Sequence, residues 1–289
     1  MKTGSVQKAI ILAGGTGGRL DPITRGAYNK VNIEVHRHPL LAYLLKTLEE
    51  NGVREVALVV RPDHQQEFEQ LIRSGKYPRS LKYTIIHTPF RESGYRTTHM
   101  LGKVFQDKAF LQFAGRQPVA VLFGDTFYFP KFFKRALADF NSKKRPVFLA
   151  SPEYTTTEHD GAFHEETVES HEFAQRKYSP AISGFFSTPE FFQFLHGHSG
   201  STVGMMGILA SAHKQGFRTA VMHGQLININ NPADYIGLRE VLAGKLRFPY
   251  PRNWVRSYRA ELERITHRAE GRQSYRNRLI EERKKFHRG

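Results

Sequence analysis

The chain of 289 residues contains no cysteine. It therefore cannot form a disulfide, bind a metal through thiolates or use a thiol as a nucleophile. It also lacks a cleavable apolar core behind its first charged residues, and no uncharged run approaches the length of a membrane-spanning helix. These absences lead us to expect a soluble, cytoplasmic protein with no membrane partner.

Acidic residues are scarce relative to basic ones. The chain has 27 Asp and Glu against 43 Lys and Arg, which gives a net charge of +16. Residues 245–289 alone hold 14 Lys and Arg against 5 Asp and Glu, a net of +9. Because a strongly basic protein attracts anions, nucleotides, sugar phosphates, nucleic acid and anionic lipid are all candidate partners at this level.

The most informative stretch lies near the N-terminus. An apolar run over residues 9–13 predicts a β-strand that leads directly into a glycine-rich turn. Without side chains in the way, backbone N–H groups of such a turn can approach a phosphate chain. We expect the nucleotide to be bound along this segment, at Leu12, Ala13, Gly14, Gly15, Gly17 and Gly18. Arg19 and Lys30 then supply positive charge for phosphate oxygens.

Two familiar glycine motifs are missing from this stretch. No Gly-Lys-Ser or Gly-Lys-Thr triplet follows the first glycines, so the stretch is not a Walker A loop. The dinucleotide-binding pattern G-x-G-x-x-G matches poorly, because Pro22 stands where its helix should continue and is expected to interrupt regular structure. A different kind of phosphate site is therefore indicated.

Residues 14–24 together with Lys30 resemble the signature of the sugar-1-phosphate nucleotidyltransferases, G-G-x-G-T-R-L-x-P-L-T followed by P-K. Gly18 stands where that family usually has Thr, and Asn29 where it often has Pro. The resemblance implies an enzyme that converts an NTP and a sugar 1-phosphate into an NDP-sugar and pyrophosphate, with Mg²⁺ as cofactor. It also implies that Arg19 and Lys30 are the catalytic residues.

Strand-like and helix-like stretches alternate from residue 8 to residue 147. Helical spacing of apolar residues over 39–51 and 64–74 alternates with buried-strand runs over 53–60 and 81–87. This rhythm predicts a Rossmann-like, doubly wound sheet that is mixed but mainly parallel, with ligands at the carboxyl ends of its strands. We expect a catalytic domain over residues 1–246 and a basic, mostly helical extension over residues 247–289.

A carboxylate follows another predicted strand, at Asp125. The apolar run of residues 118–123 ends in Gly124-Asp125, which places this carboxylate at the sheet edge where phosphates would lie. The resemblance implies that Asp125 binds both nucleotide and metal. It places Asn228 at the second metal ligand, where the family usually has Asp. An amide carbonyl can still bind Mg²⁺, although it brings one less negative charge.

The resemblance also implies residues that contact the base and the sugar. His87 stands where a base-reading Gln often lies, and Gly94 matches a glycine of the loop that contacts base and ribose. The family's E-K-P element, whose lysine binds the sugar phosphate, is absent. Lys177 is the nearest cation before the segment around Gly184, which is similar to the strand bordering the family's sugar site.

Several alternatives remain open from the sequence. The departures at Gly18 and Asn228, together with the missing E-K-P element, would suit a non-catalytic homologue that binds nucleotide or NDP-sugar as a sensor. The basic extension could bind RNA, because aromatic residues lie among its arginines, or it could be a packed arm or homo-oligomer contact. The acceptor could also be another phosphorylated alcohol, such as phosphocholine. Pro232 and Asp234 are expected to begin a helix.

Overall fold

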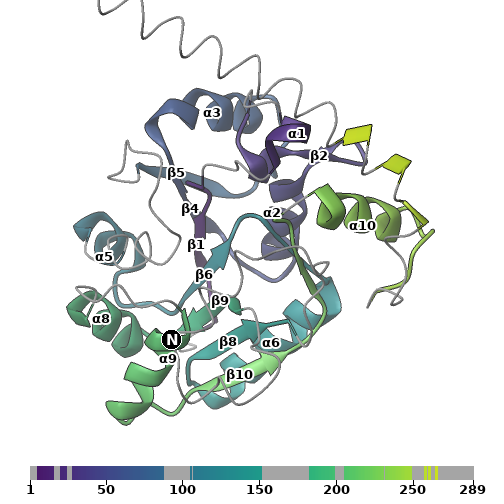
Figure 1. Cartoon of the computed structure of the whole chain (residues 1–289). Helices are drawn as coiled ribbons and strands as arrows, with labels where there is room; N and C mark the ends of the chain where they lie inside the picture. The colour runs from purple at the N-terminus through teal and green to yellow at the C-terminus, as the bar shows by residue number, and fades with distance from the viewer. Residues whose placement is uncertain are drawn as a thin grey trace, which may run out of the picture.

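A central sheet with helices on both faces forms the body of the protein (Figure 1). The structure is a computed structural model. It describes residues 5–15, 20–24, 28–87, 105, 107–151, 182–198, 205–230, 232–248, 257, 258, 260, 261, 264 and 265. Within these residues, no helix is long and apolar enough to cross a membrane.

The sheet has seven strands in the order β10-β8-β9-β6-β1-β4-β5. Their bounds are β1 (Lys8–Leu12), β4 (Glu55–Val60), β5 (Lys82–His87), β6 (Val119–Phe123), β8 (Val147–Ala150), β9 (Ile182–Ser187) and β10 (Ala220–His223). Only β9 runs antiparallel to its neighbours among these strands. The predicted mixed, mainly parallel sheet is therefore confirmed, and the other six strands end at one common edge.

Helices cover both faces of the sheet (Figure 1). One face carries α2 (Leu40–Glu50), α3 (Gln65–Arg73) and α6 (Pro130–Lys143), and the other carries α5 (Lys108–Ala114), α8 (Pro189–His198) and α9 (Met205–Lys214). The helices predicted over 39–51 and 64–74 are thus confirmed as α2 and α3. Pro22 was expected to interrupt regular structure, but it lies within the one-turn helix α1 (Asp21–Thr24), since a first helical turn tolerates proline.

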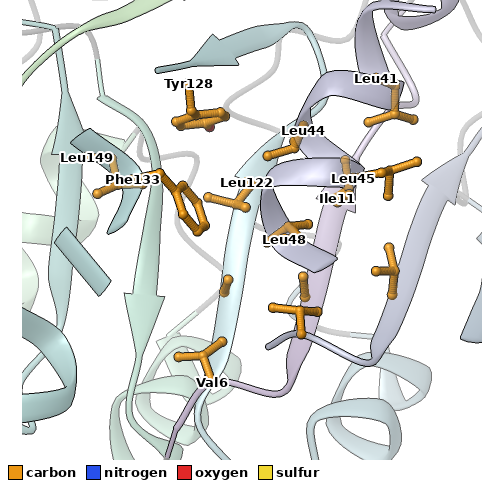
Figure 2. Close-up of a cluster of buried hydrophobic side chains, with 14 of the residues drawn as sticks. Val6, Ile11, Leu41, Leu44, Leu45, Leu48, Leu122, Tyr128, Phe133 and Leu149 are labelled. Atoms are coloured by element: carbon orange, nitrogen blue, oxygen red, sulfur yellow. The ribbon is translucent and has the colours of Figure 1, made fainter. Parts of the chain in front are cut away.

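The core follows the alternation of side chains along β1. Ala9 and Ile11 belong to the cluster under α2, whereas Ile10 and Leu12 belong to the cluster under α5 and α8. Burial of a leucine or isoleucine side chain such as Ile10, Ile11 or Leu12 contributes about 1.5–3 kcal/mol. The leucines of α2 lie over β1 and β6 in Figure 2, where they are labelled Leu41, Leu44, Leu45 and Leu48.

A smaller layer extends beyond the main sheet. It comprises the antiparallel pair β7 (Thr126–Tyr128) and β11 (Leu226–Asn228), the hairpin β2 (Glu34–Val35) and β3 (His38–Pro39), and helix α10 (Pro232–Leu242). Leu20, Ile33, Phe127 and Ile227 are buried together in this layer. The predicted helix start at Pro232 is confirmed, and the Asp234 carboxylate accepts a hydrogen bond from the Asn230 N–H at 2.9 Å.

Three described residues of the C-terminal extension, Tyr258, Glu261 and Ile265, contact α10. Arg239 of α10 donates two hydrogen bonds to the Glu261 carboxylate, at 2.8 and 3.0 Å. These bonds raise the pKa of Arg239 and lower that of Glu261. Tyr258 and Ile265 also pack against the buried side chain of Ile236. This packing favours the interpretation of the extension as an arm, while the predicted boundary near residue 246 stays a prediction.

A close approach between strands explains the glycine at position 184. In β9, Gly184 lies opposite Leu122 of β6 and Leu149 of β8. A Cβ atom built at this position would lie 2.7 Å from the Val121 carbonyl oxygen, which belongs to the backbone and cannot move aside easily. The sheet therefore needs a glycine here whether or not the residue also borders a sugar.

We expect Gly184→Ala to lower the free energy of unfolding by about 1–3 kcal/mol, because the added methyl group overpacks the sheet. Chemical denaturation would measure the change. Gly197→Ala is the matched control, since a Cβ atom there meets nothing within 4 Å and alanine favours the helix. Equal stability of the two variants would contradict this account of Gly184.

Candidate active site

The site lies where β1 ends, in the middle of the sheet. The Ala13 N–H donates to the Val59 carbonyl of β4 at 2.9 Å, and the Gly124 N–H donates to the Leu12 carbonyl at 3.0 Å. The end of β1 is thus tied to both neighbouring strands before the chain enters the glycine-rich turn at Gly14. Gly17, Gly18 and Arg19 lie outside the described residues, so their roles stay predictions.

Gly124 brings Asp125 close to the end of β1. A Cβ atom at Gly124 would lie 3.2 Å from three atoms, the Leu12 carbonyl oxygen and side-chain carbons of Ile11 and Val31. This spacing is tighter than ordinary packing allows. Glycine therefore lets β6 turn directly against β1, and the next residue, Asp125, emerges at the shared carboxyl edge.

Lys30 and Asp125, to which the sequence analysis gave separate roles, are in contact at this edge. The Lys30 ammonium Nζ forms an ion pair with Oδ2 of Asp125, although the residues are 95 positions apart. The side chains are 16% and 15% exposed, so water screens the pair only partly. A Cβ atom at Gly15 would lie 3.2 Å from Cε of Lys30, so the end of the lysine side chain passes close to the backbone of this glycine.

The β7–β11 ladder places Asn228 beside Asp125. Asn228 pairs with Thr126, whose hydroxyl donates to Asn228 Oδ1 at 3.2 Å. The Ile229 N–H donates to the Asp125 carbonyl at 2.8 Å, which links the residue after β11 to the residue before β7. The Asp125 carboxylate, in the turn between β6 and β7, and the Asn228 amide carbonyl, at the end of β11, are both hard oxygen donors of the kind that Mg²⁺ binds.

No group of three or more His, Cys, Asp and Glu side chains in the described part of the chain could hold a metal by itself. A divalent cation at Asp125 and Asn228 would therefore need further oxygens from phosphate groups or water. Such partial coordination is typical of Mg²⁺ sites that are completed by a nucleotide.

Asn29 links the Lys30 segment to the end of β1. Its side-chain Nδ2 donates to the Ala13 carbonyl at 2.7 Å, and its Oδ1 accepts from the Val31 N–H at 3.1 Å. The second bond caps the short 3₁₀ helix η2 (Lys30–Asn32). One buried amide thus joins the start of the glycine-rich turn to the residue that carries the ammonium group.

Of the four residues expected to contact the base or the sugar, the structure describes two. His87 is exposed at the carboxyl end of β5, and its Nε2 lies 2.7 Å from Oε1 of Gln65. Gly184 is buried within β9, as described above. Gly94 and Lys177 lie outside the described residues. The structure therefore brings Lys30, Asp125 and Gly15 together and leaves the assignments for base and sugar as predictions.

The family model described as "Nucleotidyl transferase" matches residues 8–163 of this chain. The match includes the glycine-rich turn, Lys30 and Asp125. The chain belongs to the nucleotidyl transferase family. The family predicted from the glycine-rich signature is thereby confirmed.

Several curated relatives of the chain carry the same name. The glucose-1-phosphate thymidylyltransferase of Neisseria meningitidis is 30% identical over 131 residues, which are 45% of this chain and 41% of that protein. The enzyme of the same name from an Actinoplanes species is 28% identical over 186 residues, 62% of this chain and 57% of that protein. The alignments thus span about two fifths to three fifths of the relatives' length.

Several solved structures share the fold of this chain. A putative glucose-1-phosphate thymidylyltransferase from Bacillus anthracis superposes with a TM-score of 0.60 at 19% identity, covering 83% of this chain and 96% of that one. UDP-glucose pyrophosphorylase in complex with UDP-glucose gives 0.61 at 15% identity, with 83% and 99% covered. The inositol-1-phosphate CTP transferase of T. maritima gives 0.58 at 17% identity, with 84% and 97% covered.

The ion pair at the centre of the site predicts strong coupling between its partners. In a double-mutant cycle with Lys30→Met and Asp125→Asn, we expect the two changes to interact by about 1–3 kcal/mol in the free energy of unfolding. Each single change leaves a largely buried polar or charged partner without its counterpart, whereas the double change removes both charges.

The matched control is the more exposed i,i+4 pair of Lys143 and Asp139 on α6, whose lysine is 53% exposed. There, Lys143→Met and Asp139→Asn should couple by less than about 0.5 kcal/mol. Additive effects at Lys30 and Asp125, measured by urea denaturation, would show that the pair does not form in solution.

Proposed function

We propose that this protein is a sugar-1-phosphate nucleotidyltransferase. The observation that carries the proposal is the meeting of Lys30 and Asp125 beside Gly15, at the carboxyl edge shared by β1 and β6. A cation and a glycine-rich turn from the N-terminal part of the chain converge there with a carboxylate 95 positions beyond the cation. This combination suits a polyphosphate, which needs backbone N–H groups, positive charge and a place for a divalent cation.

The proposed reaction joins an NTP to a sugar 1-phosphate. A phosphate oxygen of the acceptor forms a bond to the α-phosphorus of the NTP. The bond between that phosphorus and the oxygen bridging to the β-phosphate breaks, and pyrophosphate leaves with the electron pair. Because the attacking oxygen is already an anion, the step needs no strong general base and no covalent intermediate. Positioning and charge neutralisation are the main tasks of the protein.

Each residue of the site has a proposed role in this reaction. The backbone N–H groups of the turn from Gly14 to Gly18 would hold the phosphate chain. Arg19 would neutralise the departing pyrophosphate, and Lys30 would stabilise negative charge at the α-phosphate. The long flexible lysine stem would let the Lys30 ammonium group reach the nucleotide phosphates while it stays beside Asp125.

Asp125 and Asn228 fit a magnesium ion. Asp125 immediately precedes Thr126, the residue that pairs with Asn228, and the Asn228 amide oxygen retains a lone pair beside its bond from Thr126. When bound, Mg²⁺ would supply positive charge to the nucleotide phosphates. The carboxylate would then be shared between the ion and Lys30, so that the site balances charges of both signs.

The names of the relatives support this chemistry and indicate how widely substrates differ. The printed names include a thymidylyltransferase, a UDP-glucose pyrophosphorylase and a CTP transferase that acts on inositol 1-phosphate. The base and the acceptor of this protein therefore need direct measurement. Within the proposal, His87 and Gly94 contact the base, and Lys177 and Gly184 border the acceptor.

The direct test is pyrophosphate release with Mg²⁺ over a grid of five NTPs with sugar 1-phosphates, inositol 1-phosphate and phosphocholine. We expect at least one pair of substrates to release pyrophosphate in proportion to nucleotide-sugar formed. Calorimetric binding of NTP without release would favour a binding-only homologue. Salt-dependent RNA binding that is lost on deletion of residues 247–289 would instead favour an RNA-binding role.

The proposed roles of the cations predict large losses of turnover. Lys30→Ala and Arg19→Ala should each lower kcat by about two to three orders of magnitude, as observed when one electrostatic contact to a transition state is removed. Lys46→Ala is the control, because Lys46 is exposed on α2. Steady-state pyrophosphate release measures all three, and a loss of less than about fivefold at Lys30 would overturn its assignment.

A further inference from the structure

A carboxylate on α3 holds the backbone turn that carries Lys30. Glu67 lies in the first turn of α3, and both of its carboxylate oxygens accept from the Asn29 N–H, at 2.9 and 3.2 Å. Its Oε1 also accepts from Nδ2 of Asn32 at 2.6 Å. The donors lie immediately before Lys30 and at the end of η2, so one acidic side chain bridges the whole turn.

The hydrogen-bonding chemistry fixes every orientation in this network. Tyr77 donates its hydroxyl proton to Asn32 Oδ1, so the Asn32 amide must turn its Nδ2 toward Glu67. Burial raises the pKa of Tyr77, and the charge of Glu67 raises it further, which keeps the hydroxyl protonated. His64 Nδ1 lies 3.2 Å from Glu67 Oε2 and must act as a donor, since a carboxylate only accepts.

Buried apolar side chains also hold the turn that carries Lys30. Val31 and Ile33 are each 1% exposed, and they anchor the backbone on either side of Asn32. The turn is therefore fixed by buried side chains and by the Glu67 carboxylate, while the Asn29 amide ties it to Ala13 at the end of β1. From this fixed turn, the Lys30 side chain extends past Gly15 to Asp125.

We propose that Glu67 is a positioning residue, which holds Asn29 and Asn32 so that the Lys30 ammonium stays at Asp125 and in reach of the nucleotide phosphates. The proposal rests on the proposed function for its catalytic consequence. Glu67 itself lies behind the turn and contacts backbone and amide groups, so it acts only through Lys30. Small displacements of a positioned group are sufficient to lower turnover, because transition-state contacts depend steeply on geometry.

The test compares Glu67→Met and Glu67→Gln with Glu69→Gln. Methionine keeps an unbranched side chain but removes both acceptor oxygens, whereas glutamine keeps one of them, so the effects should be graded. Glu69 lies on the same helix and contacts Gln65 and Arg73 instead of the turn. Circular dichroism would establish that each variant is folded, and kcat would be expressed per folded molecule.

The first readout is the rate at which an acylating reagent modifies the Lys30 amine, followed by mass spectrometry. Because this amine is held against Asp125, we expect Glu67→Met to speed its modification by about fivefold or more once the hydrogen bonds to the turn are lost. Lys46 serves as the internal control within each sample. Unchanged modification of Lys30 in folded Glu67→Met protein would overturn the proposal.

The second readout separates kcat from KM. We expect Glu67→Met to lower kcat by about 10- to 100-fold, with the KM for NTP changed less than about threefold and with Glu69→Gln at wild-type values. Faster modification of Lys30 without any loss of kcat would also overturn the positioning role. If the wild-type protein releases no pyrophosphate from any substrate pair, the proposed function fails, and the modification rate alone then decides whether Glu67 positions Lys30.

Discussion

The parallel pairing of β1 with β4 and β6 is the constraint on which the site depends. Because these three strands end at the same edge, the glycine-rich turn after β1 and Asp125 after β6 emerge side by side. Gly124 sharpens this arrangement by letting β6 turn directly against the carbonyl of Leu12. The aliphatic residues that alternate along β1 then fix its register between two helical layers, so packing of the core and placement of the site follow from one strand.

The charged groups at this edge of the sheet depend on one another for their placement. Without a cation beside it, the Asp125 carboxylate would repel the negative charges of a polyphosphate. Its pairing with Lys30 offsets that repulsion. Lys30 in turn depends on a backbone turn that is held by the Glu67 carboxylate and by the Asn29 amide. The two acidic groups near Lys30 thus make different contacts: Asp125 pairs with the Lys30 ammonium group and, in the proposed function, faces the nucleotide, whereas Glu67 binds the backbone turn that carries Lys30.

The sequence was sufficient to predict the fold class, the strand before the glycines and the position of Asp125 at a strand end. These features depend on local apolar patterns and on residues that are close in the chain. The contact between Lys30 and Asp125 depends on three-dimensional packing across 95 positions, and both residues were identified without the pairing being foreseen. Glu67 was missed because an acidic residue in the first turn of a helix is common for helix stability alone. The short ladder of β7 and β11 was missed as a pair, since each strand has only three residues.

The measurement that tests the central claim most directly follows each phosphate of the nucleotide. Once a productive pair of substrates is found, the reaction is run with the NTP labelled with ³²P at either the α- or the γ-position. The account predicts that the α-label appears in the nucleotide sugar and the γ-label in pyrophosphate, and that both transfers fail together in Asp125→Asn and Lys30→Met proteins. Transfer of the γ-label to the sugar phosphate, or release of the α-label as a free nucleoside monophosphate, would contradict it.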